Sequence, residues 1–315
     1  MSLNESELKL HCKNILQLSR IKNKIVVLCE GNIQKIESRL SPQVYKQMEQ
    51  MPDANFYNAC VPKSWKTYRP QLINCGSRQD VLNTFFQLLE LQNEIPHQSY
   101  LNPNKLFAIV DLDIQKADIN NNYQFDDTES IFYHLYDQGK VNEKNSKVHR
   151  IWVTGLIHKE AYFLTPDIQS VYSNYLNPPN YYGNSIEIEQ IYSDIVDELC
   201  QDADLHKNWQ RAFNRISYCL DIDCYDASEF QNLWKCEYKK SKDDFQKQQL
   251  ILALLTIIKA KKYWNKIQPP SDWKRSEQIF RDMLSLEIGK FYSEQECSVE
   301  NHIPFFFNIL NGLIE

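Results

Sequence analysis

Short apolar runs alternate with helically spaced apolar residues over the first half of the chain. The runs at residues 25–29 and 106–110 are continuous, which is typical of strands buried on both faces of a sheet. Shorter runs predict further strands at residues 56–61, 71–74 and 151–153. Between the runs, apolar residues recur at helical spacing, for example over residues 79–91 and 129–138. Strands that alternate with helices predict an α/β fold with a mostly parallel sheet flanked by helices.

The pattern becomes helical almost throughout the second half. A stretch rich in Tyr, Asn and Pro, residues 172–184, separates the two halves. Helical spacing then predicts helices over residues 186–200, 209–220, 227–238, 245–264 and 273–291, followed by an apolar tail over residues 303–314. We therefore expect an α/β domain over residues 1–175 and a largely α-helical domain over residues 176–315.

Acidic residues stand at the ends of two strongly predicted strands. Glu30 follows the first apolar run, and Asp111 and Asp113 end the second. The carboxyl ends of parallel strands meet at one edge of a sheet, where ligands bind, so these carboxylates could converge. Carboxylate oxygens are the ligands that Mg²⁺ prefers. The alternative, in which Asp111 and Asp113 only begin a solvated loop, stays open.

Composition and charge narrow the classes of protein. The chain has 315 residues and a formal net charge of −6, whereas nucleic-acid-binding proteins often carry a basic excess. Binding to nucleic acid would therefore need a local basic patch or metal ions. The nine cysteines include no Cys-x-x-Cys pair, which indicates reduced thiols and a cytoplasmic location. The polar N-terminus does not resemble a signal peptide, and the longest apolar run, residues 250–258, is too short to cross a membrane.

One predicted loop interleaves basic and aromatic side chains. It spans residues 62–70, and its candidate nucleic-acid-binding residues are Lys63, Trp65, Lys66 and Arg69. Such residues can contact phosphates and stack on bases. Aromatic side chains also pack into cores, so this alternative remains open.

The order of these motifs resembles that of the Toprim domain family, which occurs in topoisomerases, bacterial primases, recombination proteins and the overcoming-lysogenization-defect nucleases. The family pattern is an apolar strand ending in Glu-Gly and a later apolar strand ending in Asp-x-Asp. Here these strands are residues 25–31 and 107–113. The nuclease branch is the most similar, because its later Glu-containing segment resembles residues 158–164. The resemblance covers about residues 20–170 and implies a Toprim-like, Rossmann-like sheet.

The resemblance implies catalytic roles for five side chains. Glu30 would be a general base or a metal-linked carboxylate, while Asp111 and Asp113 would hold Mg²⁺, with Mn²⁺ as a substitute. Glu160 would complete a second metal shell, and Lys159 would stabilise charge on the phosphate. The pair Lys159 and Glu160 could also be only the solvated start of a helix.

The sequence departs from the family pattern in two respects. Family nucleases commonly carry an acid four residues after the first Glu, and here that residue is Gln34. Glu37, about one helical turn further on, could substitute for it. The chain also has no Gly-x-x-x-x-Gly-Lys loop, so any ATPase activity would come from a separate partner.

These observations predict a magnesium-dependent hydrolase of nucleic-acid phosphodiesters, with DNA as the expected substrate and a role in phage defence or in a mobile element. The alternative is a catalytically degenerate Toprim-like module that binds nucleic acid or regulates a partner ATPase. A haloacid-dehalogenase-like phosphatase is disfavoured, because such enzymes usually follow the acidic pair with Gly-Thr and here Ile114-Gln115 follows it.

Overall fold

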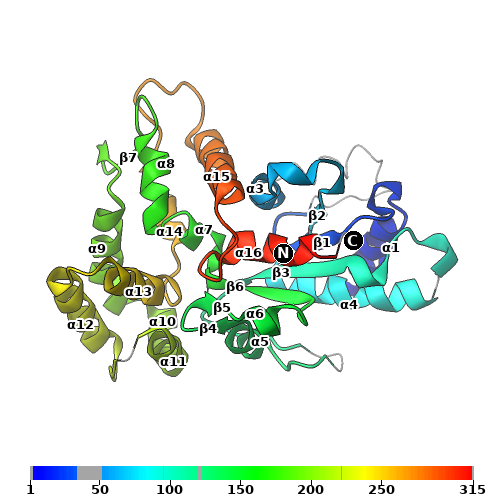
Figure 1. Ribbon diagram of the computed structural model, residues 1–315, viewed down its shortest axis with the longest axis horizontal. Helices are drawn as coiled ribbons and strands as arrows, with labels where there is room; N and C mark the ends of the chain where they lie inside the picture. Colours follow the sequence, from blue (N-terminus) through cyan, green and yellow to red (C-terminus); the bar gives the residue numbers. More distant parts are fainter. Residues whose placement is uncertain (1–2, 34–51, 95, 120–122, 221, 314–315) are drawn as a thin grey trace.

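A parallel four-stranded sheet organises the first half of the chain (Figure 1). The computed structural model describes residues 3–33, 52–94, 96–119, 123–220 and 222–313. The strands are β1 (Val26–Cys29), β2 (Gln71–Asn74), β3 (Leu106–Leu112) and β6 (Ile151–Ile157), in the order β2-β1-β3-β6 with every neighbouring pair parallel. Every residue of these strands except Asp111 is buried, which is why their sequences are almost continuously apolar. The predicted α/β class and parallel sheet are confirmed.

Helices cover both faces of this sheet. α4 (Arg78–Glu94) and α5 (Thr128–Leu135) lie on one side, and α3 (Pro52–Cys60) lies on the other (Figure 1). This arrangement is the one expected for right-handed crossovers, in which the direction of travel along the sheet decides which face the connecting helix covers. The chain moves one way from β1 to β2, and the opposite way from β2 to β3 and on to β6. The other regular elements of this half are α1 (Glu5–Leu16), β4 (Tyr136–Asp137), β5 (Lys140–Val141), α6 (Glu143–Ser146), α7 (His158–Tyr162) and α8 (Gln169–Ser173). Short 3-10 helices occupy Ser19–Ile21, Lys63–Tyr68, Pro96–Gln98, Pro103–Lys105, Pro166–Ile168 and Leu199–Gln201.

The predicted strand over residues 56–61 is wrong, because this segment belongs to helix α3. Phe56 and Cys60 are one helical turn apart and both are fully buried, so the apolar run forms the inner face of a helix. A short, mostly apolar segment such as this one, interrupted only by Asn58, does not distinguish a buried strand from a buried helix.

The second half is helical, as predicted, with one small sheet. Its helices are α9 (Ile188–Glu198), α10 (Ala203–Lys207), α11 (Trp209–Cys219), α12 (Ala227–Lys240), α13 (Asp244–Leu255) and α14 (Lys261–Trp264). Its sheet consists of β7 (Asn180–Tyr181), β8 (Asn184–Ser185) and β9 (Ile267–Gln268). The single helix predicted over residues 245–264 is two helices, α13 and α14, with residues 256–260 between them. In the parts of the chain that the structure describes, no helix is long and apolar enough to cross a membrane.

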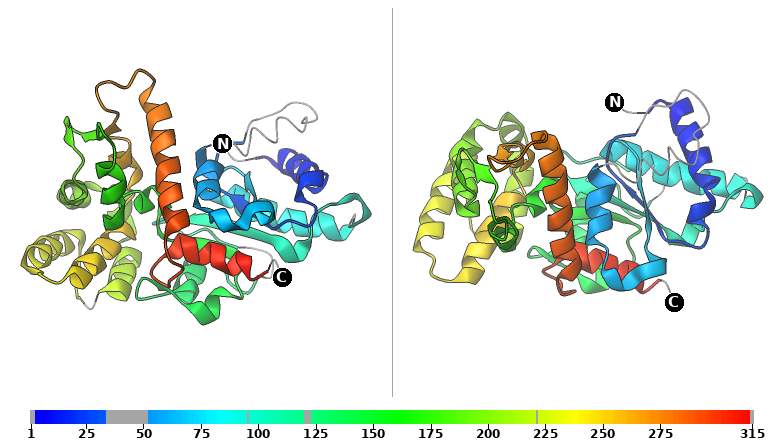
Figure 2. Two further views of the ribbon diagram at one scale, coloured as in Figure 1. Left: turned by 45° about the horizontal axis from the view of Figure 1, so that its top comes forward. Right: turned by 90° about the horizontal axis from the view of Figure 1, so that it is seen from above.

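The last two helices return to the α/β half. α15 (Glu277–Glu294) runs beside α3, and Figure 2 shows it between the sheet and the other helices of the second half. α16 (His302–Asn311) places Phe306 against Trp152 of β6, with ring centroids 5.0 Å apart. The boundary at residue 175 stays a prediction, and the segment that follows it contributes two helices to the packing of the first half.

Candidate active site

The carboxyl edge of the sheet brings together the acidic residues singled out in the sequence. Glu30 follows β1, and Asp111 lies near the end of the adjacent strand β3. The Glu30 Oε1 atom accepts a hydrogen bond of 2.7 Å from the backbone N–H of Asp111. Lys159 and Glu160 belong to α7, which directly follows β6, the neighbour of β3 on its other side. The strand order therefore makes neighbours of residues that are far apart in the sequence.

These residues line two adjoining cavities. The first has a volume of about 430 Å³ and is lined by Glu30, Asp111, Lys159 and Glu160, among others. The second has a volume of about 610 Å³ and shares Glu30 and Asp111 with the first, while Asp113 lines the second alone. All five side chains predicted as catalytic thus face one connected cleft.

Burial changes the protonation of two of the carboxylates. Burial raises the pKa of Glu30 to about 7, although the hydrogen bond from Asp111 and the charges of Arg78 and Lys159 favour its ionised form. Burial also raises the pKa of Asp111 well above its usual range, and the charge of Glu30 adds to this effect. The two carboxylates therefore resist ionising together unless further positive charge enters the cleft.

Asp113 has the opposite environment, because of a histidine that the sequence prediction missed. The Nε2 atom of His158 lies 3.8 Å from Oδ2 of Asp113, and Lys259 Nζ lies 4.0 Å from Oδ1. Burial alone would raise the pKa of Asp113, but the contact with His158 and the nearby positive charges of Arg78 and Lys259 lower it below its usual range. His158 stands at the junction of β6 and α7 with φ 58°, in the left-handed region that few non-glycine residues adopt. Its only sequence signal was its position directly before Lys159.

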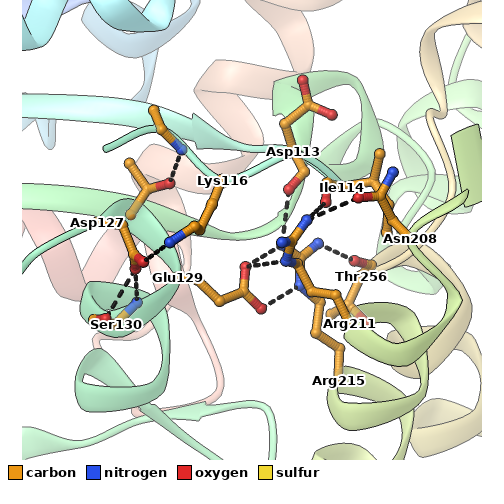
Figure 3. Close-up of polar contacts among 12 residues, drawn as sticks. Asp113, Ile114, Lys116, Asp127, Glu129, Ser130, Asn208, Arg211, Arg215 and Thr256 are labelled. Carbon is orange, nitrogen blue, oxygen red and sulfur yellow. Dashed lines mark hydrogen bonds and ion pairs between the residues drawn. The ribbon is translucent and has the colours of Figure 1, made fainter. Parts of the chain in front are cut away.

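Two arginines of α11 hold the backbone that carries Asp113 (Figure 3). The side chain of Arg215 is completely buried, and its Nη2 donates to the carbonyl oxygen of Asp113 at 2.7 Å. Its Nε donates to Glu129 Oε1 at 3.0 Å, so one carboxylate of α5 compensates the buried charge. Arg211 Nη1 donates to the carbonyl oxygen of Ile114 at 2.5 Å. The helical half thus fixes the segment after β3, although charges on helices usually indicate a solvated face.

A bulge between β3 and β6 also lies next to the site. The register shifts between the pairs Val110 with Val153 and Leu112 with Ile157. The hydroxyl of Thr154 accepts from the N–H of Leu112 at 2.8 Å and donates to the carbonyl of Leu156 at 2.8 Å. This side chain replaces a missing ladder bond and holds the backbone between Asp111 and Asp113 in place.

The predicted nucleic-acid-binding loop lies at the other edge of the sheet. Residues 63–69 lead into the start of β2, at the amino edge of a parallel sheet. Trp65 is only 6% exposed and packs edge-on against Phe307, so its ring belongs to the core and is not open to a base. Lys63 pairs with Glu294 at 2.8 Å, and Arg69 donates to the carbonyl of Asn58. Lys66 lies in the 3-10 helix Lys63–Tyr68. For Trp65, the alternative in which the aromatic side chain packs into the core is therefore the correct one.

The donors in the cleft fit a hard divalent cation. Carboxylate oxygens dominate the set, and the Oδ1 atom of Asp113 is buried without a hydrogen-bond partner. Within the described ranges, no group of three His, Cys, Asp or Glu side chains is already arranged as a complete ligand set. Gln34 and Glu37, which the sequence raised as a departure and its substitute, lie outside the described residues.

Compared with known proteins, the chain matches no family model, no curated protein and no solved structure.

Proposed function

We propose that this protein is a Toprim-like, Mg²⁺-dependent hydrolase of nucleic-acid phosphodiesters. The observation that carries the proposal is the direct hydrogen bond between the Glu30 carboxylate and the backbone of Asp111 across β1 and β3. It brings the Glu-Gly and Asp-x-Asp motifs into one cleft at the carboxyl edge of a parallel sheet, where α/β folds bind ligands.

The charge balance of the cleft supports a divalent cation. Buried Glu30 and Asp111 both have raised pKa values, so a positive ion between them would remove the penalty for ionising both. Glu30, Asp111 and Asp113 would hold the ion, with Glu160 as a further carboxylate. A bound Mg²⁺ or Mn²⁺ polarises a phosphoryl oxygen and lowers the pKa of a coordinated water.

The chain's own side chains would perform the remaining tasks. Without the ion, the Glu30 carboxyl group has a pKa of about 7 and exchanges protons near neutral pH, so Glu30 would act as a general base only if it does not itself ligate the ion. Lys159 lines the same cavity and would stabilise negative charge on the phosphate. DNA as substrate, a separate ATPase partner and a role in phage defence or in a mobile element are parts of the proposal that rest on the resemblance alone.

The ion pairs of Asp113 favour a second candidate function. His158 and Lys259 already compensate this carboxylate, as expected for a degenerate module that binds nucleic acid without cleaving it. Calorimetric titration with Mn²⁺ separates the two functions: the hydrolase should bind the ion, and the degenerate module should not.

A cleavage assay tests the proposal. Purified protein is incubated with labelled single-stranded or double-stranded DNA or RNA in Mg²⁺, in Mn²⁺ or in a chelator. We expect cleavage that requires the metal and disappears in Glu30→Ala and Asp111→Ala, whereas Asp137→Ala, an exposed carboxylate of β4, retains it. Cleavage that survives both changes in the cleft would refute the assignment.

A further inference from the structure

The cleft is completed by a lysine from the helical half. Lys261, the first residue of α14, lines the same cavity as Glu30, Asp111 and Lys159. α14 is held against α7, and the ring of Trp264 meets Phe163 edge-on with centroids 4.7 Å apart. The backbone that carries Lys261 is therefore fixed relative to the acidic residues.

Lys261 differs from the lysines around it. Lys259 pairs with Asp204 at 2.8 Å, Lys262 with Glu198 at 2.7 Å, and Lys266 with Glu198 at 3.3 Å. The side chain of Lys261 makes no hydrogen bond or ion pair with any residue that the structure describes. Acidic side chains therefore compensate the charges of the neighbouring lysines, whereas the charge of Lys261 can interact with a ligand in the cleft.

Both cavities of the cleft carry positive side chains. Lys159 and Lys261 line the same cavity, so their like charges repel each other. In the adjoining cavity, the Nη1 atom of Arg78 is buried without a hydrogen-bond partner. An anionic ligand in the cleft would relieve the repulsion between Lys159 and Lys261 and would give Lys261 and Arg78 a partner of opposite charge.

We propose that Lys261 binds a backbone phosphate of the nucleic acid, next to the phosphodiester held over Glu30 and Asp111. The helical half then supplies part of the substrate-binding surface, and the strand lies across the cleft between the two halves. This inference rests on the proposed function. In a chain with a net charge of −6, whose cleft also carries several carboxylates, Lys261 would supply one of the cations that a polyanion needs there.

Binding of a fluorescently labelled DNA oligonucleotide to the full chain, followed by anisotropy in a chelator, tests this role without cleavage. We expect Lys261→Ala to weaken binding about 3- to 10-fold at low salt, and to reduce the slope of log K against log salt by about 0.7–0.9, as for one lost phosphate contact. Lys262→Ala is the matched control, since this neighbour on α14 pairs with Glu198, and it should bind like the wild type. Lys261→Arg should restore most of the affinity.

Each outcome distinguishes this inference from the proposed function. If the wild type neither binds nor cleaves DNA or RNA, both fail. If the wild type cleaves nucleic acid while Lys261→Ala keeps the wild-type affinity and salt slope, only the role of Lys261 is refuted. Equal losses in Lys261→Ala and Lys262→Ala would also refute it, because the effect would then be one of general charge.

Discussion

At the scale of single residues, Glu30 is subject to opposing influences. Burial raises its pKa to about 7, while the amide of Asp111 and the charges of Arg78 and Lys159 favour the carboxylate. Without a bound cation, ionising Glu30 at neutral pH therefore costs stability. This cost is the electrostatic basis of the proposed metal site.

The variant Glu30→Gln should reveal this cost, because Gln stays neutral and can still accept from the amide of Asp111. The folded-state pKa of Glu30, about 7, lies above its ordinary value of 4.5. The stabilising contribution of the protonated form is thus fully present below pH 4.5 and lost as the pH rises through 7. We expect the stability of the variant relative to wild type to rise by about 1–2 kcal/mol between pH 5 and pH 8, discounted for partial exposure. Urea unfolding of the variant and the wild type in a chelator, at pH 5 and at pH 8, measures this change. The same difference in unfolding free energy at the two pH values would contradict the account.

The sequence was sufficient to predict some site residues and not others. Glu30, Asp111 and Asp113 could be found because each stands where an apolar strand ends, and strand ends meet in a parallel sheet. His158 acts through a left-handed backbone conformation, and Arg215 through the packing of α11. Neither feature has a signal in local sequence pattern.

At the scale of elements, α15 crosses α3 at very close range. A Cβ atom on Gly289 would lie 2.6 Å from Cβ of Ala59 and 2.9 Å from the carbonyl oxygen of Phe56. The absence of a side chain on Gly289 is therefore what allows α15 to approach α3 so closely.

Adding a methyl group at this crossing should separate the helices. We expect Gly289→Ala to destabilise the protein by about 1–3 kcal/mol, even though alanine is the better helix former. Gly312→Ala is the control, since its nearest neighbour would be an ordinary 3.6 Å away, and its stability should change little. Denaturant unfolding measures both, and a Gly289→Ala protein as stable as wild type would refute the close contact.

The pair of Arg215 and Glu129 joins α11 to α5 through buried charge. Replacing the arginine alone, as in Arg215→Met, leaves Glu129 only 12% exposed and without its main partner, so we expect a loss of about 3–5 kcal/mol. Adding Glu129→Gln should recover at least about 1 kcal/mol, because no uncompensated charge remains. A double-mutant cycle of the two substitutions, measured by denaturant unfolding, gives the coupling energy between Arg215 and Glu129. Strictly additive losses of stability would contradict the coupling.

Prediction of elements succeeded for most strands and helices of the first half. The strands at residues 71–74 and 106–110 and the helix at residues 79–91 are confirmed. The segment at residues 56–61 was assigned wrongly, because a short apolar run fits a buried helix as well as a buried strand, and part of its burial comes from α15, more than 200 residues later in the chain. Contacts of this kind are not visible in a window of local sequence.

At the scale of the whole molecule, the two halves share one cleft. The α/β half contributes the carboxylates, and the helical half contributes Lys259, Lys261 and the arginines that hold the Asp113 backbone. The α/β class was predictable from the alternation of strands and helices. The mutual packing of the halves was not, because it depends on side chains from distant segments.

Binding of a divalent cation should stabilise the entire chain. Mg²⁺ or Mn²⁺ at 100 times its Kd should add about 2.7 kcal/mol of stability, with a larger increase in Tm at pH 8 than at pH 5, where protons compete for the carboxylates. The double variant Asp111→Asn with Asp113→Asn should show no increase. A thermal melt with and without the ion measures this, and an equal shift in the double variant would place the ion elsewhere.

The single-turnover cleavage rate of Asp111→Asn in Mg²⁺ tests the central claim most directly. Burial raises the pKa of Asp111, so the neutral Asn side chain should be tolerated, and a thermal melt of the variant checks that it is folded. The account predicts a rate at least about 100-fold below that of the wild type, with Asp137→Asn unchanged. A rate for Asp111→Asn equal to that of the wild type would contradict it.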